Sequence, residues 1–98
     1  MKYKERLKVW IFPGESATWH FVGLNKKETK KIREKFKEFR RGFGSLPVEA
    51  KIGETKWKTS IFYSKESEQY ILPLKAEVRR KEFIRPGEMI DLELKICP

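Results

Sequence analysis

The fold is decided by residues 58–74, KTSIFYSKESEQYILPL, because they repeat the pattern of residues 8–24, KVWIFPGESATWHFVGL. Both stretches alternate apolar and polar residues around a short polar break, which is typical of two strands joined by a turn. An offset of 50 residues aligns them. The matched pairs are Lys8 and Lys58, Ile11 and Ile61, Phe12 and Phe62, and Leu24 and Leu74.

A second match follows further along the chain. The stretch VEAKI at 48–52 resembles LELKI at 92–96, at an offset of 44. The fall from 50 to 44 places a shorter connection in the second half, where we expect a helix. The chain therefore contains two related halves, about residues 5–53 and 54–97.

Each half reads as strand, strand, helix, strand. Alternating apolar residues predict the strands, and a polar segment with an apolar stripe predicts each helix. In the first half the strands are expected at 3–12, 17–24 and 45–53, with the helix from Asn25 to about Arg41. In the second half the strands are expected at 55–63, 69–75 and 89–96, with the helix at 76–82.

The longer helix has clear end signals. Asn25 can cap its N-terminus, with Glu28 three residues later. The apolar residues Ile32, Phe36 and Phe39 form one narrow stripe. Gly42 is placed to take the left-handed conformation that ends many helices.

Neither half can bury its sheet face and its helix alone. Two halves related by a pseudo-two-fold axis can close on one another and remove their open sheet edges. We therefore expect a mainly β fold with two helices, a six-stranded barrel built from a β-β-α-β repeat. Residues 1–98 are expected to form a single domain and a complete small protein, either a monomer or a weak homodimer.

The sequence also resembles a known family. The segments WHFVGL, RRGFGSLPVEAKIG, WKTSIF, YILPLKAEVRR and PGEMIDLELKI resemble, in this order, the family catalogued as domain of unknown function DUF1905. The resemblance covers about residues 5–96 and implies a six-stranded double-split β-barrel. AbrB- and MazE-type DNA-binding proteins share that architecture, so nucleic-acid binding enters as an alternative function by fold analogy.

The composition favours an anionic partner. There are 23 Lys and Arg residues against 14 Asp and Glu, a net charge of +9. Such a surface attracts nucleic acid, acidic proteins or anionic small molecules. The alternative is that the charged surface serves stability and solubility, as in proteins from hot environments.

Two features bear on location. The single cysteine, Cys97, can form no internal disulfide and lies in no zinc-ligand spacing. The longest apolar run near the N-terminus, Val9 to Phe12, is too short for a secretory signal or a membrane span. We therefore expect a cytoplasmic protein with no membrane partner.

Residues 26–41 are the most basic segment. They hold nine basic and three acidic residues, a net +6 of the total +9. One interpretation is a patch that binds phosphates. The other is a solvated helix face with pairs of opposite charge four residues apart, such as Lys30 and Glu34.

The stretch RRGFGS at 40–45 is a sharper candidate. Its arginines and glycines, Arg40, Arg41, Gly42 and Gly44, can form a glycine-rich anion site flanked by positive charge. The structural alternative is that the arginines complement the negative end of the helix dipole and the glycines end the helix. Anion-binding loops usually precede a helix, and this loop follows one.

A second cationic cluster is expected near the shorter helix. Lys75 and Arg79 are four residues apart and can share a helical face, with Arg80 beside them. The pseudo-two-fold can bring this cluster beside Lys58 or opposite Arg40. That arrangement would form a cationic mouth on the barrel.

Enzymatic readings find little support. The single histidine, His20, lies between Trp19 and Phe21 in a strand, where a packed structural role is common. We identify no serine or cysteine nucleophile with a base partner, no metal-ligand set and no cofactor motif. The exposed aromatics of a base-stacking surface are candidates at Trp10, Trp57 and Phe62, unless they fill the core.

We therefore predict a non-enzymatic binding module whose ligand or partner is anionic. The candidate ligand-binding residues are Arg40, Arg41, Gly42, Gly44, Lys58, Lys75 and Arg79. The alternatives are a nucleic-acid-binding protein of AbrB-like type and an enzyme of unrecognised type.

Overall fold

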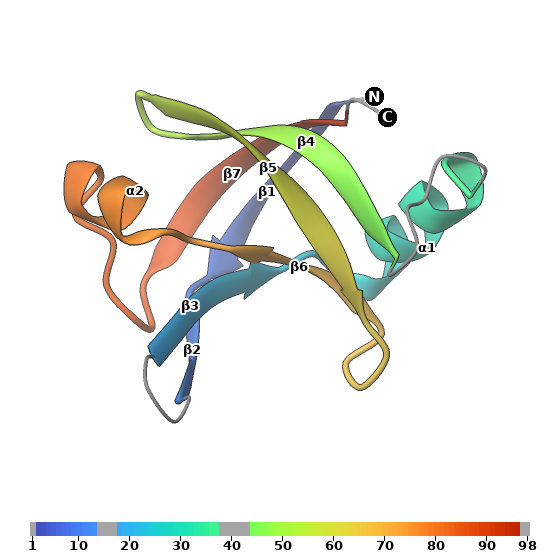
Figure 1. Cartoon of the computed structure of the whole chain (residues 1–98), viewed down its shortest axis with the longest axis horizontal. Coiled ribbons are helices and arrows are strands. Elements are labelled where there is room, and N and C mark those ends of the chain that lie inside the picture. The colour runs from blue at the N-terminus through green and yellow to red at the C-terminus, as the bar shows by residue number, and fades with distance from the viewer. Residues whose placement is uncertain (1, 14–17, 38–43, 97–98) are drawn as a thin grey trace.

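The structure is a computed structural model that describes residues 2–13, 18–37 and 44–96. Two helices and seven strands form the described chain. The strands are β1 Lys2–Lys8, β2 Trp10–Pro13, β3 Thr18–Gly23, β4 Ser45–Ile52, β5 Thr55–Ser64, β6 Gln69–Pro73 and β7 Met89–Ile96. The helices are α1 Lys26–Lys35 and α2 Ala76–Lys81, which lie at opposite ends of the molecule (Figure 1).

The first strand segment closes the sheet on itself. The strand order is β1-β7-β4-β5-β6-β3-β2, with every pair of neighbours antiparallel. β1 and β2 are separated by Val9 alone, yet they occupy the two ends of that order. One continuous segment therefore provides both edge strands of the sheet. The sheet curls into a barrel-like shape (Figure 1).

β5 pairs with its two neighbours over different parts of its length. It pairs with β4 over Thr55–Phe62 and with β6 only over Phe62–Ser64. Its first part therefore diverges from β6. This divergence leaves a gap in the sheet between the first part of β5 and β6.

Two equivalent backbone hydrogen bonds join the halves, and each becomes the other when residue numbers are shifted by 50. The amide of Leu24 donates to the carbonyl of Tyr70 at 2.9 Å, and the amide of Leu74 donates to the carbonyl of His20 at 2.8 Å. Leu74 is the counterpart of Leu24 at this offset, and Tyr70 is the counterpart of His20, so the two hydrogen bonds are equivalent. The repeat read in the sequence is thus a repeat of backbone geometry.

The core is filled by alternate residues of the strands and by one stripe from each helix. On β4 and β7 every second residue is buried, as strand alternation predicts: Leu46, Val48, Ala50 and Ile52 with Ile90, Leu92, Leu94 and Ile96. Helix α1 contributes Ile32, with Phe36 directly after the helix, and α2 contributes Val78. The predicted fold class, mainly β with two helices in a β-β-α-β order repeated twice, is confirmed. The strand count is seven because Val9 interrupts the first expected strand.

Two local predictions were wrong. The alternation of Leu7, Val9 and Ile11 predicts an inward-facing Ile11, but Ile11 is 47% exposed, because beyond Val9 the segment has left β7 and pairs only with β3. The longer helix ends at Lys35 rather than at about Arg41. Phe36 follows as the C-cap, and its amide donates to the Ile32 carbonyl at 3.0 Å.

The start of α1 and the end of α2 follow known capping rules. The Asn25 side chain accepts a 2.7 Å hydrogen bond from the amide of Glu28, as expected for an N-cap. Lys75 occupies the equivalent position before α2 without a side-chain capping bond. At the end of α2, Phe83 has a φ of 53°, and the Ile84 amide donates to the Arg79 carbonyl at 2.9 Å.

Candidate functional site

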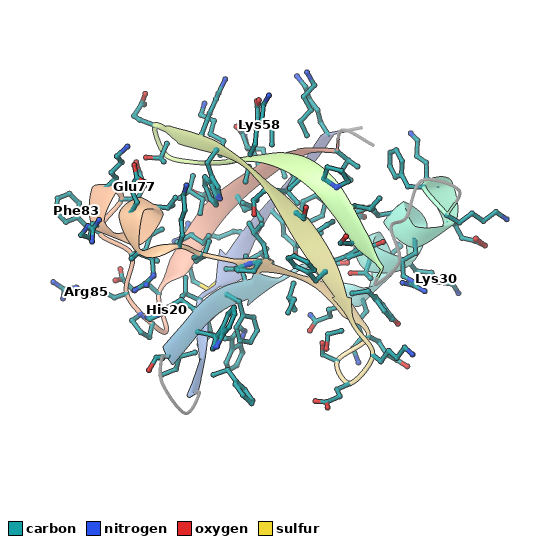
Figure 2. All side chains as sticks on the ribbon, in the orientation of Figure 1. His20, Lys30, Lys58, Glu77, Phe83 and Arg85 are labelled. Carbon is teal, nitrogen blue, oxygen red and sulfur yellow. The ribbon has the colours of Figure 1, made fainter. Side chains whose placement is uncertain are left out.

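A pocket opens where β5 diverges from β6. It has a volume of about 370 Å³ and lies beside the start of α2. Its lining includes three basic residues, Lys58 from β5, Lys75 before α2 and Arg79 within α2, together with His20 and Trp57. We call this site the cationic pocket. Figure 2 shows His20 and Lys58 in the half of the molecule that carries α2.

Arg79 is fixed by two contacts. Its Nε donates to the carbonyl of Leu74 at 3.0 Å, and its Nη1 lies 3.5 Å from Nε2 of His20. A guanidinium group only donates, so His20 accepts through Nε2 and the proton of a neutral imidazole sits on Nδ1. Two of the five N–H groups of Arg79 are used in these contacts, and its planar group is already oriented for a ligand.

The charge of the pocket is positive. Among the described residues that line it there is no carboxylate. Glu49 is the cross-strand partner of Lys58, but no ion pair joins them within the described ranges. Glu77 is engaged by Lys81 at 3.2 Å, and this hydrogen bond and charge, with a smaller effect of Lys75, lower the pKa of that carboxyl from its ordinary 4.5.

The equivalent position in the first half has different side chains. There the Asn25 side-chain amide donates to the Glu5 carboxylate, at 3.2 Å to each oxygen. Lys75 is the counterpart of Asn25 at the offset of 50, and Arg79 is the counterpart of Thr29, a buried residue whose hydroxyl accepts a backbone hydrogen bond. The position before the helix therefore carries an Asn25–Glu5 hydrogen bond in the first half and a positive charge, Lys75, in the second.

An aromatic groove covers the outer face of β2, β3, β6 and β5. Its volume is about 850 Å³. The exposed aromatic side chains along it are Trp10 (52%), Phe12 (65%), Trp19 (60%) and Phe62 (41%). Contiguous apolar surface of this kind marks interaction sites in soluble proteins. Trp19 and Pro73 line both the groove and the cationic pocket, so the two sites adjoin.

The basic face of α1 has a different character. A pocket of about 410 Å³ there is lined by Lys26, Lys30 and Arg33, but also by Glu34 and Glu68. The Arg33 guanidinium stacks 3.7 Å from the centre of the Tyr63 ring, and Lys31 pairs with Glu28 at 3.7 Å. These opposite charges and stacking contacts agree with the interpretation of α1 as a solvated helix face with pairs of opposite charge.

The sequence-predicted site residues fall into two groups. Lys58, Lys75 and Arg79 meet in the cationic pocket. Gly44 lies elsewhere, before β4, where its φ of 71° suits glycine and where a Cβ would meet Tyr63 at 3.5 Å. The remaining residues, Arg40, Arg41 and Gly42, lie outside the described residues, as does Cys97.

Sequence reasoning missed the part of the site that comes from β3. His20 was read as a structural residue, and Trp19 was not named as a site residue. A signal was present in the alternation of the first strand. If Val9 faces inward, Trp10 and Phe12 must face outward, and exposed neighbouring aromatics are unusual.

Two further searches of the described residues gave no match. Within residues 2–13, 18–37 and 44–96, no group of three or more His, Cys, Asp or Glu residues could hold a metal ion. In the same ranges, neither helix is long and apolar enough to cross a membrane.

Comparison with known proteins gives one family match. The model of the family described as "Domain of unknown function (DUF1905)" matches residues 7–94. This agrees with the resemblance read in the sequence. No curated protein matches the chain.

Proposed function

Because the chain belongs to the DUF1905 family, whose description assigns no activity, we propose from its geometry that it is a non-enzymatic binding module that takes an anionic ligand in the cationic pocket. We also propose a cytoplasmic location, in keeping with a single cysteine in the sequence. The observation that carries the proposal is the convergence of Lys58, Lys75 and Arg79 on one gap in the sheet.

The three residues come from two segments of the chain. Lys58 lies in β5, whereas Lys75 directly precedes α2 and Arg79 lies within it. Bringing like charges together costs free energy unless an anion or a carboxylate offsets it. Since none of the described residues that line the pocket is a carboxylate, an anionic ligand is the natural counterpart.

The chemistry suits phosphate or a related oxyanion. Arg79 presents a planar fork that can donate two parallel hydrogen bonds to two oxygens of one group. The lysines act as point charges that tolerate variation in the ligand's position. The Arg79 contact with the Leu74 carbonyl holds the fork in place before the ligand arrives, which lowers the entropy lost on binding.

Tripolyphosphate is a suitable probe because it carries charge without aromatic rings. Calorimetric titration at low salt should give saturable binding to the wild-type protein. Lys58→Gln should weaken that binding about tenfold, and Arg79→Gln more, since charge-assisted bonds contribute roughly 1.5–3 kcal/mol each. Lys58 is exposed, so its substitution should leave folding intact.

The matched control is the double variant Lys26→Gln/Lys30→Gln on α1. It removes more charge than either pocket variant, but from the α1 pocket. It should bind tripolyphosphate nearly as well as the wild type. Equal losses in the pocket and control variants would show that net charge alone drives binding, and would contradict the proposal.

A further inference from the structure

We propose that the ligand is a single strand of nucleic acid, whose bases stack in the aromatic groove while its phosphates reach the cationic pocket. This inference rests on the proposed function, because it uses the same pocket for the phosphates. It adds the class of ligand. It also assigns a role to the exposed aromatic residues, which the anion site does not use.

The groove offers stacking faces in neighbouring rows. Trp10 is the cross-strand partner of Phe21, and Phe12 is the partner of Trp19. Adjacent strands lie about 4.8 Å apart, so the aromatic side chains of each pair lie side by side on the sheet. Each base presents a planar face of matching size, and such stacking tolerates any base sequence.

Gly23 keeps the middle of this face low. It is the cross-strand partner of Ile71 on β6, between the aromatic rows and Phe62. A side chain at Gly23 would meet the Gln69 amide group at 3.2 Å, so any larger residue would raise the floor of the groove. The hollow gives room for a planar group to lie against the strands.

Positive charge follows the groove. At one place the Lys8 ammonium lies 4.6 Å from the centre of the Trp10 ring. The groove then adjoins the cationic pocket through Trp19 and Pro73, which line both. Among the described residues that line the groove, Glu66 is the one acidic residue. Aromatic faces bordered by cations are the combination that binds single strands without sequence preference.

This arrangement favours a single strand over two other occupants. In a duplex the base faces are covered by their neighbours, so the aromatic residues would have nothing to stack on. A second copy of the chain would bring a net charge of +9 against +9, with Lys8 and the pocket cations near the contact. A single-stranded polyanion satisfies both the apolar and the charged parts of the surface.

The test uses a fluorescein-labelled thymidine oligonucleotide of about six residues, a length within the site sizes of single-strand binders. Binding is followed by fluorescence anisotropy at low salt, and tripolyphosphate binding is measured in parallel by calorimetry. The double variant Trp10→Ala/Phe12→Ala should lose affinity for the oligonucleotide about tenfold or more and keep its affinity for tripolyphosphate. Both side chains are more than half exposed, so circular dichroism should stay unchanged.

Phe83→Ala is the matched control, because Phe83 is an 84% exposed aromatic that does not line the groove. It should bind the oligonucleotide like the wild type. The conservative variant Trp10→Phe/Phe12→Tyr, which keeps both rings, should also retain binding.

Several results would overturn the inference. If the double alanine variant bound the oligonucleotide normally while Lys58→Gln weakened it, the anion site would stand and the stacking role would fall. Absence of tripolyphosphate binding would remove the proposed function itself, and the inference with it. Tighter binding of a duplex of equal length would reject the single strand, as would a wild-type dimer in sedimentation that the double variant dissociates.

Discussion

Ala50 on β4 and Leu94 on β7 are cross-strand partners, and each is the counterpart of the other at the offset of 44. The pairs around them exchange in the same way, because Val48 faces Ile96 and Ile52 faces Leu92. The internal two-fold relation therefore passes between Ala50 and Leu94. At this point one half contributes a small side chain and the other a large one.

This relation predicts the effect of a swap. Leu94→Ala should cost about 2–5 kcal/mol through lost burial and a cavity. Ala50→Leu should cost about 1–3 kcal/mol by overpacking. In the double variant Ala50→Leu/Leu94→Ala the total volume returns, so its cost in urea unfolding should be at least about 1 kcal/mol below the sum of the single costs. Additive costs would show that the two positions are not equivalent partners.

The turn between β4 and β5 should be sensitive to a side chain. Gly53 has a φ of 59°, and an added Cβ would collide with the Glu82 carboxylate, which accepts a 2.6 Å hydrogen bond from Thr55. Gly53→Ala should therefore destabilise the protein by about 2–3 kcal/mol. Gly87→Ala is the control, with a φ of 85° and open space around it, and should cost only about 1 kcal/mol. Equal losses in chemical denaturation would contradict this reading.

The helix starts differ in their dependence on side chains. Asn25→Ala removes the bond to the Glu28 amide and the contact with Glu5, so it should cost about 1–2 kcal/mol. Lys75→Ala removes no capping bond and should change the unfolding free energy by at most about 0.5 kcal/mol. Thermal and urea unfolding of the two variants would compare them directly. A larger loss at Lys75 would be inconsistent with the capping assignment.

The carboxyl group of Glu77 should titrate below its ordinary pKa of 4.5, chiefly because of the hydrogen bond from Lys81. Since its pKa is lowered on folding, any stabilisation is present above the unfolded pKa and is lost as pH falls through the folded pKa. The pKa follows from carboxyl chemical shifts in an NMR titration. Lys81→Met should raise it toward the ordinary value, and an unchanged pKa would exclude Lys81 as the cause.

Phe83 should be replaceable with a gain in stability. It takes a left-handed conformation after α2, where glycine is favoured, and its side chain is 84% exposed. Phe83→Gly should stabilise the protein by about 0.5–1 kcal/mol, measured as a higher denaturation midpoint at an unchanged slope. A loss of stability would indicate a contact of the Phe83 ring that outweighs the backbone strain.

Much of the fold was predictable because the apolar residues of the two halves follow the same pattern. The inward positions of β4 and β7 alternate strictly, and strand alternation is a local property that sequence displays directly. The division of the first strand at Val9 was not predictable in this way. It depends on which neighbour each part pairs with, and pairing is decided by the whole barrel rather than by local residues.

The site was predictable only in part. Lys75 and Arg79 share a helical spacing, so their proximity could be read from the sequence, and the repeat brought Lys58 toward them. The contribution of His20 could not, because it depends on β3 lying beside the gap that β5 leaves when it diverges from β6. The exposure of Trp10 and Phe12 likewise depends on a sheet face that neither helix lines.

NMR mapping can locate the anion site. Amide and side-chain shifts of the labelled protein would be followed during a titration with tripolyphosphate. Binding in the cationic pocket should give saturable shifts at His20, Lys75 and Arg79. Shifts that centre instead on Lys26, Lys30 and Arg33 of α1, or that spread evenly over the basic surface without saturating, would contradict it.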